Sequence, residues 1–421
     1  MDKFVIHGGN ELKGSVQISG AKNATLALMP AALLASGESV LLNTPELNDV
    51  FTMSKLLKQL GAEIQFENNV LKINSATVNN QTAPYEHVKK MRASVYVLGP
   101  LLARYGFAKV SLPGGCAWGP RPINLHLEGL KKLGADIELD EGYIIVKAKR
   151  LHGAKINFDK SSVGATGNIL MAAVLAKGAT IINNAAMEPE ITNLVNFLEK
   201  MGAKISGINT SIFEIEGVDE LHPAEIETIP DRIEAGTFLV AAAITKGNIL
   251  VRGGIDAHLY AVLSKLEDAG VLIEVNGNDI RINAQNIDPR SVDVYTGIFP
   301  GFPTDMQAQW LALMSIADSV STVTDTIYTD RFSHVAELAR LGADISVQEN
   351  NAVIKGVKKL SGAKVMSTDL RASASLVLAG LAAEGVTEVL RVYHLDRGYQ
   401  RLEEKLRQLG ADIERVAGQE F

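Results

Sequence analysis

The sequence has little of what several large classes of protein depend on. Its 421 residues include one cysteine, Cys116, so no intramolecular disulfide can form and a reducing compartment is expected. The formal net charge is −7, whereas a nucleic-acid-binding protein usually carries a basic surplus. No apolar run approaches the roughly 18 residues that a membrane-spanning helix needs. We therefore expect neither nucleic acid nor membrane insertion among its interactions.

Motifs for common cofactors are missing as well. There is no GxxxxGK[ST] loop, no GxGxxG after a strand and no cysteine cluster for zinc. Glu188 and Glu190, in EPEI, suggest a carboxylate metal site, but helix capping or charge pairing explains them better. We therefore predict no metal and no cofactor, and infer no obligate protein partner. The first residues contain no long apolar stretch, so we expect no secretory signal and a cytoplasmic protein.

What the chain does contain is a repeat. Six times, at intervals of about 70 residues, a helical pattern ends in glycine and a short β-rich segment follows, a longer period than that of most solenoids. Glycine suits the end of a helix because the chain there often turns through a left-handed conformation. The glycines of the copies are Gly61, Gly134, Gly202, Gly270, Gly342 and Gly410.

A second pattern recurs between these copies. It is a nearly all-apolar helix, a break and a strand, as in LMAAVLAKGATII. The breaks are Gly37, Gly106, Gly178, Gly247, Asp318 and Gly385. Helices that are apolar all round are buried, whereas the amphipathic helices that end in glycine lie at a surface. Each unit is predicted to be strand, buried helix, strand, surface helix and hairpin. Three units make one domain, and the boundary falls near Thr228–Pro230.

The residues at the starts of the apolar helices are unusually polar. They are Lys22, Asn23, Arg92, Ser162, Gly164, Asp231, Arg232, Asp305, Asp369 and Arg371. For Asp231, Thr304 and Thr368, ordinary N-capping explains the residue about as well as a role in substrate binding does. Capping does not account for the cations, because a positive charge at a helix N-terminus is electrostatically unfavourable. A bound anion would remove this conflict, so we predict a phosphorylated substrate.

Two further segments are candidates for chemistry. Cys116 follows Gly114-Gly115 in SLPGGCAWGPRPINLH, and Arg121 nearby could lower its thiol pKa. A lone cysteine is more often a small buried hydrophobe, but glycines and prolines on both sides favour a surface loop and a reactive thiol. In HLDR, His394 and Arg397 precede the last amphipathic helix, where an ion pair at a solvated helix start is the simpler explanation.

These segments resemble the UDP-N-acetylglucosamine enolpyruvyl transferases over the whole chain. The resemblance rests on ISGAKNA, MRAS, LPGGC, GPRP, SVGAT, EPEI, PTDMQAQ, DLRASASLVLAG and YHLDRGY. It implies an inverted (inside-out) α/β barrel with two domains, each of three βαβαββ repeats with buried parallel helices, which agrees with the repeat count. Residues 21–229 would form the first domain, which carries the Cys116 loop. Residues 230–421 would form the second, completed by residues 1–20.

The resemblance also implies roles for individual residues. Lys22, Arg121 and Arg397 would hold the phosphate and carboxylate of phosphoenolpyruvate, with Arg92 nearby, and Asn23 would fix the tetrahedral intermediate. The residues implied for the uridine are Arg121, Pro122, Ile123, Asn124 and Leu125. Those implied for the diphosphate are Lys160, Ser162, Val163 and Gly164. Those implied for the sugar, the nucleotide and support of the site are Thr304, Asp305, Ile327, Arg331, Asp369 and Arg371.

The implied chemistry is addition followed by elimination, with both substrates bound and no cofactor. Asp305 would take the proton of the sugar 3′-hydroxyl, and Asp369 would share the proton traffic. Cys116 would protonate C3 of phosphoenolpyruvate and can form an adduct at C2. Two residues depart from the pattern, since aspartate is expected at Asn124 and lysine at Asn48.

Two other functions are compatible with part of this pattern. One is enolpyruvyl transfer to shikimate 3-phosphate on the same fold, against which the loop Cys116 and the ISGAKNA opening count. The other is a non-catalytic paralogue that binds a nucleotide sugar, against which the joint presence of Lys22, Cys116, Asp305 and Arg397 counts. Phosphate release from phosphoenolpyruvate with each acceptor distinguishes the three functions.

Overall fold

The computed structural model describes residues 2–88, 91–112 and 123–418. Three of the predicted site residues, Cys116, Arg121 and Pro122, lie outside this described part. The chain forms two compact units, one of residues Gly20–Ile229 and one of Met1–Ser19 together with Pro230–Phe421. Each unit has a hydrophobic core of its own.

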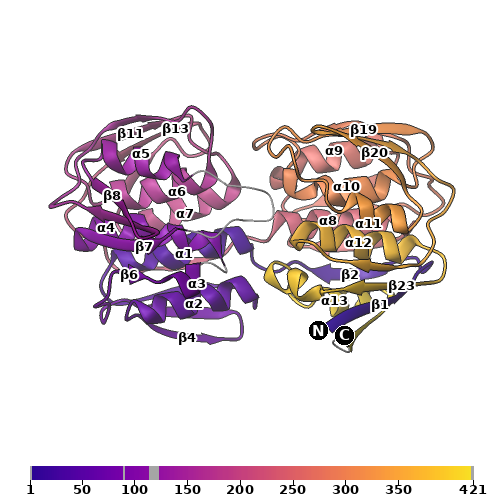
Figure 1. Ribbon diagram of the computed structural model, residues 1–421, viewed down its shortest axis with the longest axis horizontal. Helices are drawn as coiled ribbons and strands as arrows, with labels where there is room; N and C mark the ends of the chain where they lie inside the picture. The colour runs from indigo at the N-terminus through magenta and orange to yellow at the C-terminus, as the bar shows by residue number, and fades with distance from the viewer. Residues whose placement is uncertain (1, 89–90, 113–122, 419–421) are drawn as a thin grey trace. The chain divides into compact units, whose positions relative to one another are not determined.

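Helices fill the inside of each unit (Figure 1), and the apolar ones supply much of its hydrophobic core. In the unit Gly20–Ile229 the apolar helices are α1 (Lys22–Ala31), α4 (Leu98–Tyr105) and α6 (Val163–Ala173). The others there are α2 (Asn48–Gln59), the short α3 (Tyr85–Val88), α5 (Asn124–Lys132) and α7 (Pro189–Lys200). In the second unit the apolar helices are α8 (Arg232–Ile244), α10 (Gln307–Met314) and α12 (Leu370–Ala382). The amphipathic ones there are α9 (Tyr260–Asp268), α11 (Val335–Arg340) and α13 (Leu402–Gln408).

Among the described residues, each unit also has three four-stranded sheets. In the unit Gly20–Ile229 their strand orders are β14 (Glu225–Glu227), β3 (Glu38–Leu42), β5 (Val70–Asn74), β4 (Glu63–Glu67); β6 (Thr82–Ala83), β7 (Phe107–Ser111), β9 (Tyr143–Lys147), β8 (Asp136–Asp140); and β10 (Lys155–Asn157), β11 (Ala179–Asn183), β13 (Ile212–Glu216), β12 (Lys204–Ser206). In the second unit they are β22 (Lys364–Met366), β23 (Val386–Leu390), β1 (Asp2–His7), β24 (Asp412–Ala417); β16 (Leu272–Asn276), β17 (Asp279–Asn283), β15 (Asn248–Arg252), β2 (Lys13–Gln17); and β18 (Val294–Tyr295), β19 (Val320–Thr324), β21 (Asn351–Lys355), β20 (Asp344–Gln348).

Each sheet contains one parallel strand pair, as between β10 and β11, and is otherwise antiparallel. Buried and exposed side chains alternate along the strands, as in β13, so one face of a sheet packs on the core and the other faces solvent. The sheets are therefore outside and the apolar helices inside. The predicted inverted α/β barrel is confirmed.

The glycines that end the amphipathic helices have the conformation expected of them. All six have φ between +93° and +105°, the left-handed region that side chains other than glycine rarely adopt. Among the breaks after the apolar helices, Gly37, Gly106, Gly178 and Gly385 also have positive φ. The fourth break differs, since Lys246 rather than Gly247 takes the positive φ, at 53°.

The first strand of the first repeat and the first strand of the fourth repeat each pair in the unit that does not contain the following helix. Strand β2 precedes α1 in the sequence but pairs in parallel with β15 of the second unit. In return, β14 precedes α8 and pairs in parallel with β3 of the unit Gly20–Ile229. Strand β1 lies between β23 and β24 and completes the last hairpin. The chain therefore passes from one unit to the other twice, at residues 19–20 and 229–230.

A substitution at Gly217 can show how tightly the repeats are packed. A methyl group on Gly217 would overlap the carbonyl oxygen of Ala176, so the backbone would have to move. Gly217→Ala should lower the free energy of unfolding by about 3 kcal/mol in urea denaturation. Gly178→Ala is the control, because its Cβ meets nothing within 4 Å and only its φ of +91° is unfavourable, at about 1 kcal/mol. Equal losses in the two variants would contradict this description of the packing.

Candidate active site

In the second unit, two of the predicted helix starts are ordinary N-caps. Asp231 accepts hydrogen bonds from the backbone N–H groups of Ile233 and Glu234, at 2.8 and 3.1 Å. Asp369, rather than its neighbour Thr368, caps α12 by accepting from Arg371 N and Ala372 N at 2.9 and 3.2 Å. The capping explanation therefore holds for Asp231, and at the start of α12 the cap is the aspartate.

Asp305 at the start of α10 does something else. It lies in the 3-10 turn η4 (Thr304–Met306), and its carboxylate is held by two arginines. Oδ1 lies 2.8 Å from Arg331 Nη1, and Oδ2 accepts from Nη2 and Nε of Arg371 at 3.0 and 3.2 Å. The side chains of Arg331 and Arg371 are 8% and 4% exposed, and that of Asp305 is 28% exposed. Three predicted residues thus form one buried cluster that opens to solvent at the carboxylate.

The charge state of this cluster follows from its geometry. Burial alone would raise the pKa of the Asp305 carboxyl, but the ion pairs with Arg371 and Arg331 outweigh it and hold the pKa well below its usual range. Asp305 is therefore ionised at every pH at which the protein would work. A carboxylate in this state can always accept a proton, although it holds one weakly.

A buried polar network of Tyr399, Thr237 and Gln309 lies next to Arg371 and Asp305. The guanidinium lies 5.3 Å from the centre of the Tyr399 ring. The Tyr399 hydroxyl is 2.9 Å from Thr237 Oγ1, and Gln309 Nε2 donates to Thr237 Oγ1 at 3.1 Å and to the Asp305 carbonyl at 3.0 Å. Burial raises the pKa of Tyr399, so its hydroxyl stays protonated. This network restricts where the Arg371 side chain can lie.

Asp325 organises the neighbouring loop. Its fully buried carboxylate accepts from Thr304 Oγ1 at 2.7 Å and from the backbone N–H of Ile327 at 3.0 Å. Arg331 Nη1 in turn donates to Thr304 Oγ1 at 3.0 Å. The predicted residues Thr304, Ile327 and Arg331 are therefore brought together by an aspartate that the sequence reasoning did not single out. The feature of the sequence that could have indicated Asp325 is its position directly after strand β19.

Asp369, His394 and Arg397 lie close enough to influence one another. Arg397 ends the 3-10 segment η5 (Val392–Arg397), which contains His394. Burial lowers the pKa of His394, Arg397 lowers it further, and Asp369 acts in the opposite direction. Asp396 pairs with Arg415, at 2.6 and 3.0 Å, in an ion pair to the last strand. An ion pair does anchor this helix start, and it connects Asp396 to β24.

In the unit Gly20–Ile229, Lys22 is the first residue of α1 and is paired. Its Nζ lies 2.7 Å from Oδ2 of Asp49, near the start of α2, and the two side chains are 12% and 5% exposed. The neighbouring Asn23 is exposed. A nearly buried aspartate thus holds the lysine ammonium at a helix N-terminus, where the helix dipole alone would disfavour a cation.

The starts of α5 and α6 lie side by side. Ser162 caps α6 by accepting from Ala165 N at 3.3 Å, and the first residues of the helix are Val163 and Gly164. The two starts are in contact, since a Cβ on Gly164 of α6 would come 3.0 Å from Nε2 of His126, the third residue of α5.

Other predicted residues lie around these two helix starts. Ile123 and Asn124 begin α5, with Leu125 next. The exposed Lys160 precedes the cap of α6. Arg92 begins the 3-10 segment η2 (Arg92–Val97), in which the Tyr96 hydroxyl donates to Val163 O at 3.3 Å. The residues predicted for the uridine and the diphosphate, so far as the structure describes them, therefore lie at two adjacent helix starts in this unit.

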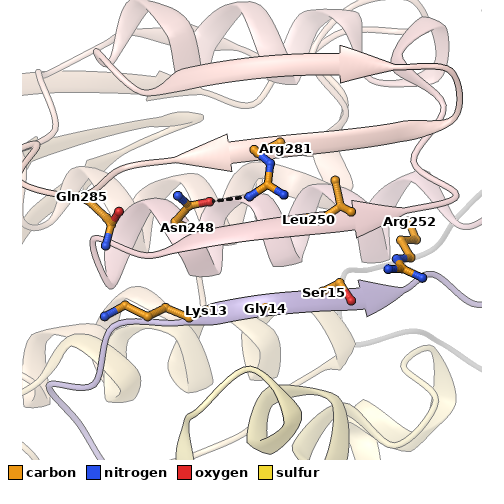
Figure 2. A pocket seen from close by; sticks show the side chains of 8 residues that line it. All are labelled: Lys13, Gly14, Ser15, Asn248, Leu250, Arg252, Arg281 and Gln285. Atoms are coloured by element: carbon orange, nitrogen blue, oxygen red, sulfur yellow. Dashed lines mark hydrogen bonds between the residues drawn. The ribbon is translucent and has the colours of Figure 1, made fainter.

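The hollow in Figure 2 is elsewhere. It lies on the outer face of the sheet that contains β2, β15 and β17, and side chains such as Lys13, Arg252 and Arg281 line it. Arg281 Nη1 donates to Asn248 Oδ1 at 3.1 Å. None of the lining residues is at the start of an apolar helix, so this surface is distinct from the predicted site.

The comparison with known proteins identifies the family. The sequence profile of EPSP synthase (3-phosphoshikimate 1-carboxyvinyltransferase) matches residues 6–406. The chain belongs to the EPSP synthase family. The prediction of an enolpyruvyl transferase is thus confirmed at the level of the family. None of the described helices is long and apolar enough to cross a membrane.

Relatives within the EPSP synthase family match this member from end to end. A UDP-N-acetylglucosamine 1-carboxyvinyltransferase of Chloroherpeton thalassium is 60% identical, with 100% of this chain and 99% of that protein covered. One of Trichlorobacter lovleyi is 55% identical, with 99% and 100% covered.

Two solved structures have the same fold. The enolpyruvyl transferase NikO from Streptomyces tendae has a TM-score of 0.91 at 26% identity, with 99% of both chains covered. EPSP synthase from Acinetobacter baumannii has a TM-score of 0.76 at 18% identity, with 99% of this chain and 100% of that chain covered.

Proposed function

We propose that this EPSP synthase family member transfers the enolpyruvyl group of phosphoenolpyruvate to the 3′-hydroxyl of UDP-N-acetylglucosamine and releases phosphate. The observation that carries the proposal is full-length identity of 55–60% to proteins named UDP-N-acetylglucosamine 1-carboxyvinyltransferase. An EPSP synthase of solved structure shares 18%. In a cell this would be the first committed step of peptidoglycan synthesis, carried out in the cytoplasm by two domains that correspond to the two compact units.

The substrates would be held by the cations and helix starts described above. Lys22, Arg121 and Arg397, with Arg92, would bind phosphoenolpyruvate, and Asn23 would contact the intermediate. The start of α6, from Ser162 to Gly164, would bind the diphosphate with its free N–H groups, together with Lys160. The residues proposed for the uridine are Arg121, Pro122, Ile123, Asn124 and Leu125. Those proposed for the sugar and the adjoining nucleotide are Thr304, Asp305 and Ile327.

In the addition step, the sugar 3′-oxygen bonds to C2 of phosphoenolpyruvate while C3 gains a proton from Cys116. Asp305 accepts the hydroxyl proton. Because its arginine partners keep its pKa low, we propose that this proton leaves as the C–O bond forms, when the hydroxyl becomes acidic, rather than before. In the elimination step C3 loses a proton and the phosphate leaves C2, with Asp369 sharing in the proton transfers. Arg331 and Arg371 would keep the Asp305 carboxylate in place.

The direct test measures phosphate released from phosphoenolpyruvate with each acceptor. Release with UDP-N-acetylglucosamine, together with the enolpyruvyl product by mass spectrometry, is the expected result. Release with shikimate 3-phosphate instead would establish the other activity of the family. Binding of the nucleotide sugar without release would establish a non-catalytic binding protein. Either of these two outcomes refutes the proposal.

Cys116 provides an independent prediction. The epoxide fosfomycin, which resembles phosphoenolpyruvate, should alkylate its thiolate and raise the intact mass by one adduct, faster with UDP-N-acetylglucosamine present. Cys116→Ser should abolish the adduct. Cys116→Asp should resist alkylation but keep activity, because a carboxyl group can still donate the proton. An adduct on the serine variant, or none on an active wild type, would contradict the role of Cys116.

A further inference from the structure

The hydroxyl hydrogen of Tyr399 has a fixed direction. Thr237 Oγ1, inside α8, lies 2.7 Å from the backbone carbonyl oxygen of Ile233, which can only accept, so the Thr237 hydroxyl donates its one hydrogen there. Thr237 Oγ1 is therefore the acceptor in its 2.9 Å contact with the Tyr399 oxygen, and Tyr399 is the donor. Both side chains are buried, so leaving any of these groups unpaired would be costly.

With its hydrogen committed to Thr237, the Tyr399 oxygen can only accept further hydrogen bonds. Gln309 Nε2 lies 3.3 Å from it, but the two hydrogens of that amide have nearer acceptors, Thr237 Oγ1 at 3.1 Å and the Asp305 carbonyl at 3.0 Å. A lone pair of the Tyr399 oxygen is therefore left for another buried donor, the Arg371 guanidinium, whose carbon lies 5.3 Å from the ring centre. Burial raises the pKa of Tyr399 and the charge of Arg371 counteracts part of this rise, as expected of close neighbours.

The position of Arg371 determines the orientation of the Asp305 carboxylate. Arg371 donates from both Nε and Nη2 to one oxygen, Oδ2 of Asp305, so a displacement of the guanidinium weakens both hydrogen bonds at once. Arg331 pairs with the other oxygen, Oδ1. The direction in which Asp305 presents its lone pairs to a substrate therefore depends on where Arg371 is held.

The backbone at Tyr399 is held independently of the hydroxyl. Its N–H donates to the carbonyl oxygen of Leu395 at 2.9 Å. A Cβ on Gly398 would come 2.5 Å from Leu370 Cδ2, so the turn before Tyr399 is packed against the first residue of α12. Removing the hydroxyl should therefore leave the chain near Arg397, the residue proposed for phosphoenolpyruvate, where it is.

We propose that Tyr399 is a positioning residue for the transfer reaction. Its hydroxyl holds the Arg371 guanidinium in the place from which two nitrogens reach Asp305, and so directs the carboxylate toward the sugar hydroxyl. Tyrosine suits this task because its apolar ring packs beside the guanidinium while its oxygen is a rigidly placed acceptor. The proposal rests on the proposed function for the role of Asp305 as proton acceptor.

The first test is kinetic. Tyr399→Phe keeps the ring and removes the oxygen, so kcat should fall roughly tenfold, the effect of losing one hydrogen bond that aligns the proton acceptor. The KM of each substrate should change by less than roughly twofold, because the helix starts and Arg397 are untouched. In an Asp305→Asn background the same substitution should have no further effect on kcat, since no proton acceptor is left to align. An equal loss in both backgrounds, or a raised KM with unchanged kcat, would overturn the proposal.

Two further substitutions control for the loss of a buried hydroxyl. Thr237→Val removes the acceptor that directs the Tyr399 hydrogen and should also lower kcat, whereas Thr237→Ser keeps the hydroxyl and should recover most of the rate. Tyr105→Phe is the matched control, because Arg104 lies 4.9 Å from the centre of that ring but the Tyr105 hydroxyl has no hydrogen-bond partner among the described residues. Its kcat should equal that of the wild type. Equal rates in the two Thr237 variants would contradict the role of the hydroxyl direction.

The second test does not depend on activity. In protein with 15N-labelled arginine, the Nε–H of Arg371, assigned with Arg371→Lys, should exchange its hydrogen with water at least roughly tenfold faster in Tyr399→Phe than in the wild type. In Tyr105→Phe the exchange should not change. Equal exchange in Tyr399→Phe and the wild type would show that Tyr399 does not hold Arg371. If the wild type forms no enolpyruvyl product but this exchange still depends on Tyr399, the proposed function fails and the positioning of Arg371 stands.

Discussion

Asp305→Asn should lower turnover by roughly 10²–10⁴-fold while binding of UDP-N-acetylglucosamine largely survives. The substitution keeps the size and polarity of the side chain but removes the negative charge and the ability to accept the hydroxyl proton. Thr304 and Asp325, which shape the neighbouring loop through a 2.7 Å hydrogen bond, are untouched. Steady-state kinetics with both substrates varied, and calorimetry with the nucleotide sugar, measure the two effects separately.

The same variant should also be less stable, because it leaves two buried arginines without their carboxylate. We expect its free energy of unfolding at pH 7 to fall by about 3 kcal/mol. The folded-state pKa of Asp305 is depressed, so the stabilisation is complete above the unfolded value of about 3.9 and is lost as the pH falls below it. The difference between wild type and variant should therefore be roughly 1 kcal/mol smaller at pH 3 than at pH 7.

Asp369→Asn is the matched control for Asp305→Asn. It removes a second carboxylate from the same surroundings but keeps a side-chain oxygen that can accept the capping hydrogen bonds at α12. A smaller loss of turnover is expected, in keeping with a shared role in proton transfer. If Asp305→Asn is almost fully active and Asp369→Asn is not, the proton acceptor is Asp369 and the assignment to Asp305 is wrong.

Lys22→Met should reduce turnover by at least roughly 10²-fold, because it removes a cation placed to stabilise the charge of phosphoenolpyruvate and the departing phosphate. The KM for phosphoenolpyruvate should rise as well. The substitution also takes away the ammonium 2.7 Å from Asp49, so the nearly buried carboxylate loses this ion pair. The free energy of unfolding should therefore fall by about 3 kcal/mol.

A double variant separates these two consequences. In Lys22→Met/Asp49→Asn the carboxylate is neutralised, so most of the lost stability should return in urea unfolding, while turnover should stay low because the cation is still absent. Recovery of both stability and turnover would mean that Lys22 acts only by pairing with Asp49. In that case its proposed role toward phosphoenolpyruvate would be wrong.

Much of the architecture could be predicted because it depends on neighbouring residues. An all-apolar stretch of helical length has to be buried wherever it occurs, and a glycine after an amphipathic helix permits a positive φ by itself. The repeat therefore indicated both classes of helix, their order and the glycine turns, all of which the structure contains. The motifs at the helix starts, such as PTDMQAQ and DLRASAS, carried the resemblance for the same reason, since each is a short continuous segment.

The partners of those residues could not be read in the same way, because they lie on other elements of the chain, some of them in other repeats. Asp305 meets Arg371, 66 positions away, only because α10 and α12 pack against each other in one core. Asp49, Asp325 and Tyr399 resemble ordinary helix, turn and core residues until the structure places them beside Lys22, Thr304 and Arg371. Likewise His126 contacts Asn168, 42 positions away in the next repeat, with 3.0 Å between Nδ1 and Nδ2.

The sequence by itself thus determined the repeat, the two classes of helix and the polar residues at the helix starts, since these follow from local periodicity and backbone preference. Only the tertiary structure decided which carboxylate holds which cation, and that β2 and β14 pair outside the units that contain the helices following them. The physical reason is that ion pairs, hydrogen bonds and strand pairing depend on distance in space, which chain packing sets and local sequence does not.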